Sequence, residues 1–224
     1  MFRTKNANPV ISYLNLRRLI GYVGILLPLV CFLGGKLFAN LPIQQSISFY
    51  YHTNVRDFFV GLLVGVSLLL ITYKGYEVID DIVSTITGIF GLGIVIFPCL
   101  LAKEVKCPIG FFQLKPDCSN ILHIACSVFF FGLLAVNSFF LFTLTDKKKE
   151  MSNNKKKRNI IYKVCGILIS ITLIAMIIIV LTVNEQIVEE KRIVFVFETI
   201  MLVSFGVSWL VKGETILRDP KLKK

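Results

Sequence analysis

Long apolar runs recur along the chain, separated by short polar stretches. They cover residues 19–38, 55–73, 82–102, 121–145, 160–183 and 193–211. A helix needs about 20 such residues to cross a hydrocarbon layer of ~30 Å. Strands of a membrane barrel would instead read as alternating segments of about ten residues. The pattern therefore predicts an all-α polytopic membrane protein, a bundle of six transmembrane helices in a single domain over residues 1–224.

The placement of Lys and Arg predicts the orientation of this bundle. Segments facing the cytoplasm carry an excess of these residues. If the N-terminus is cytoplasmic, the segments on that side, including a basic linker at 146–159, hold far more Lys and Arg than the opposite side. We therefore expect both termini in the cytoplasm.

The composition fits a membrane protein better than a nucleic-acid binder. The chain is 55% hydrophobic and 17% charged, with a net charge of +11. Soluble domains carry about 25% charged residues. The basic residues cluster between apolar runs instead of forming a basic face mixed with aromatic side chains. We therefore expect membrane lipids as partners, with a second copy or another membrane protein as further candidates, and no nucleic acid.

A few polar side chains fall where the topology predicts the outer third of the membrane. A charge near the membrane centre costs roughly 2–3 kcal/mol or more, so each one needs a reason. Glu198 lies five residues into the last run, about 8 Å below its outer boundary. The candidate residues of an outward-facing polar pocket are Ser46, Tyr50, His52, Asp57, His123 and Glu198.

Structural roles are open for the same residues. Asp57 is placed to cap the second helix, where the helix dipole favours an acid, and Tyr50 to lie in an aromatic belt. His123 is placed to reach the headgroups. Glu198 needs a partner or a proton, which a structural ion pair or a neutral acid would also provide.

Two further patterns concern cysteine and glycine. Cys107 and Cys118 bracket a ten-residue loop predicted to lie outside, where a disulfide can form; two free thiols are the alternative. Gly61 and Gly65 form a small-xxx-small pair that allows close helix approach.

Four stretches together resemble an uncharacterised family of bacterial multi-pass membrane proteins. They are "SISFYYHTNVRDFFVG", "YKGYEVIDD", "GIFGLGIVIFP" and "SWLVKGE". The resemblance covers residues 46–214. It implies a six-helix inner-membrane protein and implies no chemistry.

Ser46, His52 and Asp57 also resemble the early part of the superfamily of alkaline ceramidases and adiponectin receptors. Those membrane hydrolases hold zinc with a late HxxxH pair and have seven helices. Here the pair is missing, the last helix carries Glu198 without a His, and six helices are predicted. The resemblance implies a zinc site of His52, His123 and Asp57 that would polarise a water.

Three functions follow from these patterns. The first is a non-enzymatic bundle that binds a lipid, a small solute or a partner through the polar pocket. The second is a zinc-dependent hydrolase of lipid amides or esters. The third is a proton-coupled carrier with Glu198 as the titrating group, although the sequence lacks the inverted repeats common in carriers. The patterns favour the non-enzymatic bundle.

Overall fold

The computed structural model describes residues 13–75, 77–101, 107–144 and 152–218. The helices there are α1 (Tyr13–Phe38), η1 (Ser48–His52), α2 (Arg56–Thr72), α3 (Val78–Ile96), α4 (Pro116–Phe139), η2 (Leu141–Thr143), α5 (Asn153–Thr182), α6 (Glu185–Glu190) and α7 (Ile193–Lys212). Within these ranges no strand forms, and the β-structure is an isolated antiparallel bridge between Ile109 and Leu114. The predicted all-α class is confirmed for this part of the chain.

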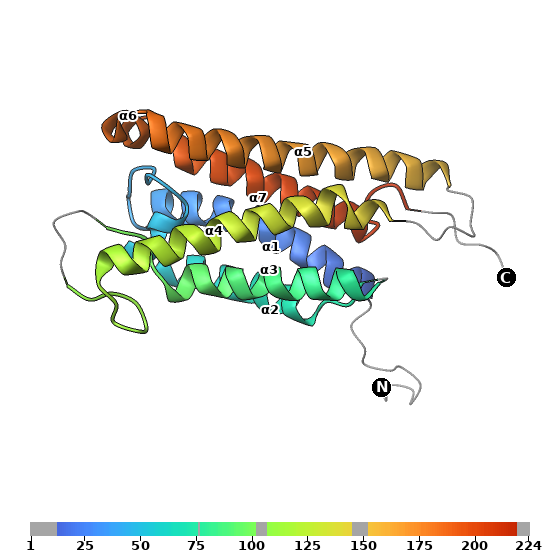
Figure 1. Cartoon of the computed structure of the whole chain (residues 1–224), viewed down its shortest axis with the longest axis horizontal. Helices are drawn as coiled ribbons and strands as arrows, with labels where there is room; N and C mark the ends of the chain where they lie inside the picture. Colours follow the sequence, from blue (N-terminus) through green and yellow to red (C-terminus); the bar gives the residue numbers. More distant parts are fainter. Residues whose placement is uncertain (1–12, 76, 102–106, 145–151, 219–224) are drawn as a thin grey trace.

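The long helices of the described residues form a closed ring. Its order is α1, α2, α3, α4, α5 and α7, and α7 packs back against α1. Figure 1 shows these helices running along the long axis of the molecule, with α5 and α7 above and α2 and α3 below. We call the end that carries η1 and α6 the η1 end. The opposite end, where α1 begins and α7 finishes, is called the termini end.

In the part of the chain that the structure describes, five helical segments are long and apolar enough to cross a membrane. They are α1, α3, α4 extended through η2, α5 and α7. Large apolar side chains cover their outer faces; Ile171 of α5 and Phe129 of α4, for example, are more than half exposed. Such a surface needs lipid around it. This supports a multi-pass membrane protein.

The second predicted helix is the shortest of the ring. α2 has 17 residues, which span about 26 Å at 1.5 Å per residue. This is slightly less than a hydrocarbon layer of ~30 Å. The structure therefore shows α2 as a helix of the bundle. It is shorter than the five described helices that are clearly long enough to span a membrane.

The third helix is displaced from its predicted position. It covers Val78–Ile96, whereas the apolar run extends over 82–102. Glu77 and Asp80 form a capping box that starts the helix early. Pro98 disfavours a helical conformation at Phe97 and ends it. Pro98 therefore lies outside the helix, which corrects the assignment of 97–101 to a span; residue 102 lies outside the described residues.

Capping residues also move the starts of α4 and α5. Pro116 occupies the first turn of α4, a position suited to its fixed φ, so this helix starts before the predicted residue 121. The Ser152 side chain accepts a hydrogen bond from the Lys155 amide and caps α5. The predicted linker 146–159 is corrected accordingly: 153–159 are helical, and 145–151 lie outside the described residues.

Glycines set the contact between α1 and α7. A Cβ on Gly21 would lie 2.8 Å from the Gly206 carbonyl oxygen, which is closer than real Cβ atoms approach a backbone. Only glycine allows the two backbones this distance. Gly61 and Gly65 of α2 behave differently, because a Cβ on either one would meet no atom within 4 Å. Within the described residues, no helix approaches this pair closely.

Candidate functional site

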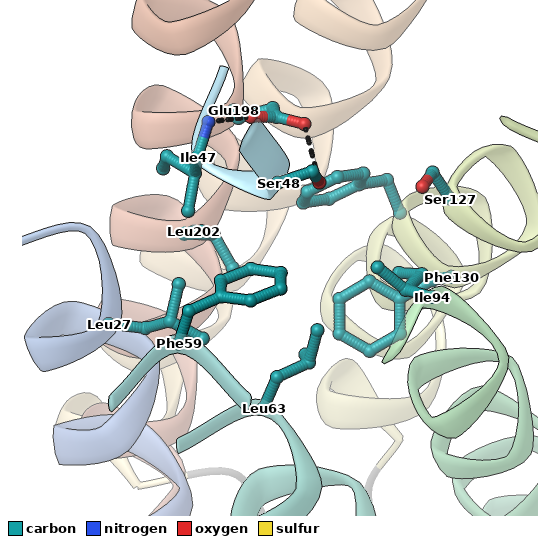
Figure 2. A pocket seen from close by; sticks show the side chains of 11 residues that line it. Leu27, Ile47, Ser48, Phe59, Leu63, Ile94, Ser127, Phe130, Glu198 and Leu202 are labelled. Atoms are coloured by element: carbon teal, nitrogen blue, oxygen red, sulfur yellow. Dashed lines mark hydrogen bonds between the residues drawn. The ribbon is translucent and has the colours of Figure 1, made fainter. Parts of the chain in front are cut away.

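The connection between α1 and α2 folds over the η1 end and is bound to α7. The Ile47 amide donates a hydrogen bond to Glu198 Oε2 (2.5 Å), and the Ser48 hydroxyl donates to Oε1 (3.3 Å). The Phe195 amide donates to the Gln45 carbonyl (3.0 Å). Figure 2 shows the Glu198 carboxylate between Ile47 and Ser48. The carboxylate is thus held at the start of η1 by the backbone amide of Ile47 and the side-chain hydroxyl of Ser48.

A small cavity lies beside this carboxylate. Its volume is about 20 Å³, which is room for a single water. Ser48, Ser127 and Glu198 contribute polar groups to its wall, and apolar side chains from α1, α2, α3, α4 and α7 form the rest (Figure 2). Pockets for small molecules have volumes of about 300–1,000 Å³. At this place the structure holds a water-sized space.

Ser46 and Tyr50 shape the same connection. The Phe49 amide donates to Ser46 Oγ (2.9 Å), which supports the first turn of η1. The Tyr50 side chain is buried. Its ring packs so closely on Gly35 that a Cβ at that glycine would lie 2.9 Å from the ring atom Cε1. Tyr50 also packs near Phe195, with ring centroids 6.4 Å apart. Both residues therefore contribute to the folding of the connection.

The two histidines bind the backbone that follows α3. His52 Nε2 lies 2.8 Å from the Cys99 carbonyl oxygen. His123 Nδ1 lies 2.8 Å from the Phe97 carbonyl oxygen and 3.2 Å from that of Ile94. The last carbonyls of a helix have no partner within the helix. His123 provides one for α3.

Burial lowers the pKa of His52, and the positive charge of Arg56 lowers it further. The hydrogen bond to the Cys99 carbonyl opposes both effects, because it favours the protonated ring. Burial is the largest of the three causes.

Asp57 lies apart from the other candidates. Its side chain is 94% exposed, and the Arg56 Nε atom lies 3.8 Å from its Oδ1. As the first acid of α2, it is placed to interact with the helix dipole. Of the six sequence candidates, Ser46 and Tyr50 belong to the connection and Glu198 of α7 binds it, while His52 and His123 support the end of α3.

The residues proposed for zinc do not form a ligand set. Asp57 points to solvent, and the histidines bind different carbonyls. Among the described residues, no three His, Cys, Asp or Glu side chains come together as metal ligands. Cys107 and Cys118 are both exposed and carry free thiols.

A larger groove opens on the outer face of the ring between α1 and α2. Its volume is about 460 Å³. It is lined by Leu19, Val23, Gly61, Leu62, Gly65, Leu68, Leu69 and Thr72. The Thr72 hydroxyl donates to the Leu68 carbonyl of its own helix (3.0 Å), so the lining offers a ligand almost only hydrocarbon. The open faces of Gly61 and Gly65 form part of this groove.

The termini end contains a cluster that sequence reasoning missed. The Trp209 ring contacts the Tyr73 and Phe142 rings edge to face, with centroids 4.8 and 5.0 Å apart. The Phe142 ring in turn contacts that of Tyr162 at 5.5 Å. These aromatic side chains come from the C-terminal cap of α2 and from η2, α5 and α7. Together they close the core at this end.

Cations lie against this aromatic cluster. The Arg17 guanidinium is 5.6 Å from the Tyr73 ring centroid, Lys212 Nζ is 4.9 Å from that of Phe142, and Lys155 Nζ is 5.6 Å from that of Tyr162. Arg17 and Lys212 are 7% and 6% exposed. We call these four rings and three cations the basic–aromatic cluster.

Each cation–π contact contributes about 0.5–2 kcal/mol. This is less than the several kcal/mol that it costs to remove a charge from water. In the sequence, a Lys or Arg beside an apolar run looks the same whether it points outward or inward. The available signal was the spacing of Trp209 and Lys212, which are three residues apart and therefore share a helix face.

No protein-family model, no curated protein and no solved structure matches this chain.

Proposed function

We propose that this protein is a non-catalytic, lipid-binding membrane protein, whose α1–α2 groove takes one acyl chain of a phospholipid. In this account α2 crosses the membrane with the five longer helices, and both termini are cytoplasmic. The observation that supports the proposal is the apolar groove of about 460 Å³. The side chains that line an empty groove lack dispersion contacts on one side. An acyl chain that fills the groove provides them and so stabilises the bundle.

The shape of the groove favours a hydrocarbon chain over a protein helix. On α2 its lining extends from Gly61 to Thr72, about 16 Å along the helix axis. Its volume then corresponds to a mean width of about 6 Å. A helix with its side chains is about 10–12 Å across. A helix of a second copy would therefore cover the groove without filling it, whereas an acyl chain fits inside.

Glycine substitutions that fill the groove test this function. A Cβ at Gly61 or Gly65 meets nothing within 4 Å, so the double variant Gly61→Leu, Gly65→Leu is expected to fold. Gly132 of α4 has the same open surroundings but does not line the groove, which makes Gly132→Leu a matched control. Native mass spectrometry of protein purified in mild detergent measures the lipid that stays bound.

We expect the wild type and Gly132→Leu to retain a single phospholipid and the double variant to lose it. Equal retention by all three proteins would contradict the proposal. Loss of a dimer, with lipid unchanged, would assign the groove to a second copy instead.

The hydrolase and carrier hypotheses remain predictions from the sequence. In the described residues Glu198 is engaged by the connection, and the histidines are engaged by backbone carbonyls. Nothing in that part of the structure favours either hypothesis over lipid binding.

A further inference from the structure

We propose that the α1–α2 groove takes its phospholipid from the leaflet at the termini end, with the headgroup beside Thr72 and the methyl end of the acyl chain beside Gly61. This inference rests on the proposed function, because it states which leaflet supplies the lipid and how the chain lies in the groove. Three observations carry it: the position of the groove along its two helices, its length, and the order of the side chains that line it.

The groove is displaced toward the termini end of both helices that form it. α2 begins at Arg56, beside η1, and finishes at Thr72. The lining reaches this last residue, but at the other end it stops at Gly61, five residues or about 8 Å from Arg56. On α1, which begins at the termini end, the lining comprises Leu19 and Val23, both in the first half of the helix. The groove therefore reaches the end of α2 on one side only.

The length of the groove matches the depth of a single leaflet. From Gly61 to Thr72 the lining covers about 16 Å along the helix axis, and half of a hydrocarbon layer of ~30 Å is about 15 Å. A chain that starts at the level of Thr72 therefore stays inside the groove along its whole length.

A lipid of the opposite leaflet would fit the groove less well. Its chain would start near Arg56 and would cross about 8 Å before it reached Gly61. That part of the chain would lie outside the groove and would lose the dispersion contacts that the walls provide. The remaining part would be too short to fill the groove as far as Thr72.

The side chains along the groove follow the order that this orientation requires. Among the described residues that line it, Thr72 alone has a polar side chain, and it lies at the termini end. Its hydroxyl donates to carbonyls of its own helix and keeps acceptor lone pairs that suit a polar neighbour. At the other end, a Cβ on Gly61 would meet no atom within 4 Å. The polar part of the lipid thus lies beside a hydroxyl, and the methyl end lies in open, apolar space.

The distribution of Lys and Arg predicts that the termini end faces the cytoplasm. With that orientation, the bound lipid belongs to the cytoplasmic leaflet. The direction of the chain relative to α2 follows from the groove itself and does not depend on the topology.

Two tryptophans placed along the groove test the direction of the chain. In a Trp209→Phe background, Leu68→Trp lies toward Thr72 and Leu62→Trp lies beside Gly61, about 9 Å apart along α2. Each protein in detergent is titrated with a phosphatidylcholine brominated near the carboxyl end of its chains and, in a second arm, with one brominated near the methyl end. Phe129→Trp, on the exposed face of α4, is the control. Circular dichroism checks folding; if Trp209→Phe does not fold, Trp209 is kept and its own quenching, measured in the wild type, is subtracted.

The quantity compared is the ratio of saturable quenching by the carboxyl-end bromines to that by the methyl-end bromines. We expect this ratio to be above one for Leu68→Trp and below one for Leu62→Trp. Saturable quenching with the reverse order, or with equal ratios, would overturn the orientation and leave lipid binding intact. Absence of saturable quenching at both positions, as in Phe129→Trp, would overturn the proposed function and the orientation with it.

Discussion

The Ile47 amide and the Glu198 carboxylate are joined by a hydrogen bond of 2.5 Å across 151 positions of sequence. Ser48 donates to the other oxygen of the same carboxylate at 3.3 Å. One buried acid of α7 thus determines how the connection between α1 and α2 closes the η1 end. Glu198 is in this respect a structural residue, and its partners are one backbone amide and one side-chain hydroxyl.

Removing the Glu198 carboxylate should loosen this connection. Glu198→Ala leaves the Ile47 amide and the Ser48 hydroxyl without their acceptor, and an unsatisfied buried group costs about 1–3 kcal/mol. Glu198→Gln keeps one acceptor oxygen and should cost less. In detergent, the unfolding temperature should be highest for the wild type, lower for Glu198→Gln and lowest for Glu198→Ala. Limited proteolysis should cut residues 39–55 fastest in the Ala variant. An Ala variant as stable and as protected as the wild type would show that the hydrogen bonds contribute nothing.

Replacing a glycine by alanine should change the stability in opposite directions at two places on the ring. Gly21→Ala puts a Cβ 2.8 Å from the Gly206 carbonyl oxygen, and overpacking of this kind costs about 1–3 kcal/mol. Gly65→Ala meets no atom within 4 Å and gains up to about 1 kcal/mol of helix propensity. Unfolding temperatures of the two variants, compared with that of the wild type, test the prediction. A stabilising Gly21→Ala would contradict the packing of α1 on α7.

His52 should make stability depend on pH near neutrality. Burial holds the pKa of His52 below its usual value, so the folded protein prefers the neutral ring. Its contribution is complete above the unfolded pKa of about 6.5 and is lost as the pH falls below that value. Wild type and His52→Gln, unfolded in parallel between pH 8 and pH 5, separate this effect from other titrations. The wild type should lose more stability on acidification, and parallel curves would contradict the assignment.

Much of the fold could be predicted from the sequence, because apolar runs report burial in lipid directly. Each of the six predicted runs overlaps a helix of the ring, and the ends that moved follow local chemistry. Pro98 ends α3, and Ser152 starts α5 inside the predicted linker. The short helix α6 was missed, since an Asn184 cap and six residues leave little periodic signal.

The candidate site was harder to predict for a physical reason. Sequence patterns show that Glu198 is in an apolar run. They do not show that the backbone amide of Ile47 donates a hydrogen bond to it. They show Lys212 and Arg17 beside apolar runs, but not that both turn toward aromatic rings inside the bundle. Contacts of this kind depend on tertiary packing of helices distant in sequence.

The exposed thiols of Cys107 and Cys118 provide a test of topology. If the η1 end is outside, a membrane-impermeant maleimide should label them in intact cells. In a background with both changed to Ser, a Lys74→Cys thiol at the end of α2 should stay unlabelled until the membrane is opened. Labelling of Lys74→Cys in intact cells would mean that α2 does not cross. Labelling of Cys107 and Cys118 only after reduction would contradict the free thiols of the structure.

The central claim is that an acyl chain occupies the α1–α2 groove, and a tryptophan placed in the groove measures this most directly. In a Trp209→Phe background, Leu62→Trp lies in the groove, and Phe129→Trp on the exposed face of α4 serves as control. Both proteins in detergent are titrated with a phospholipid carrying brominated chains. The account predicts saturable quenching at low lipid content for Trp at 62 and only gradual quenching for Trp at 129. Identical gradual curves at both positions would contradict it.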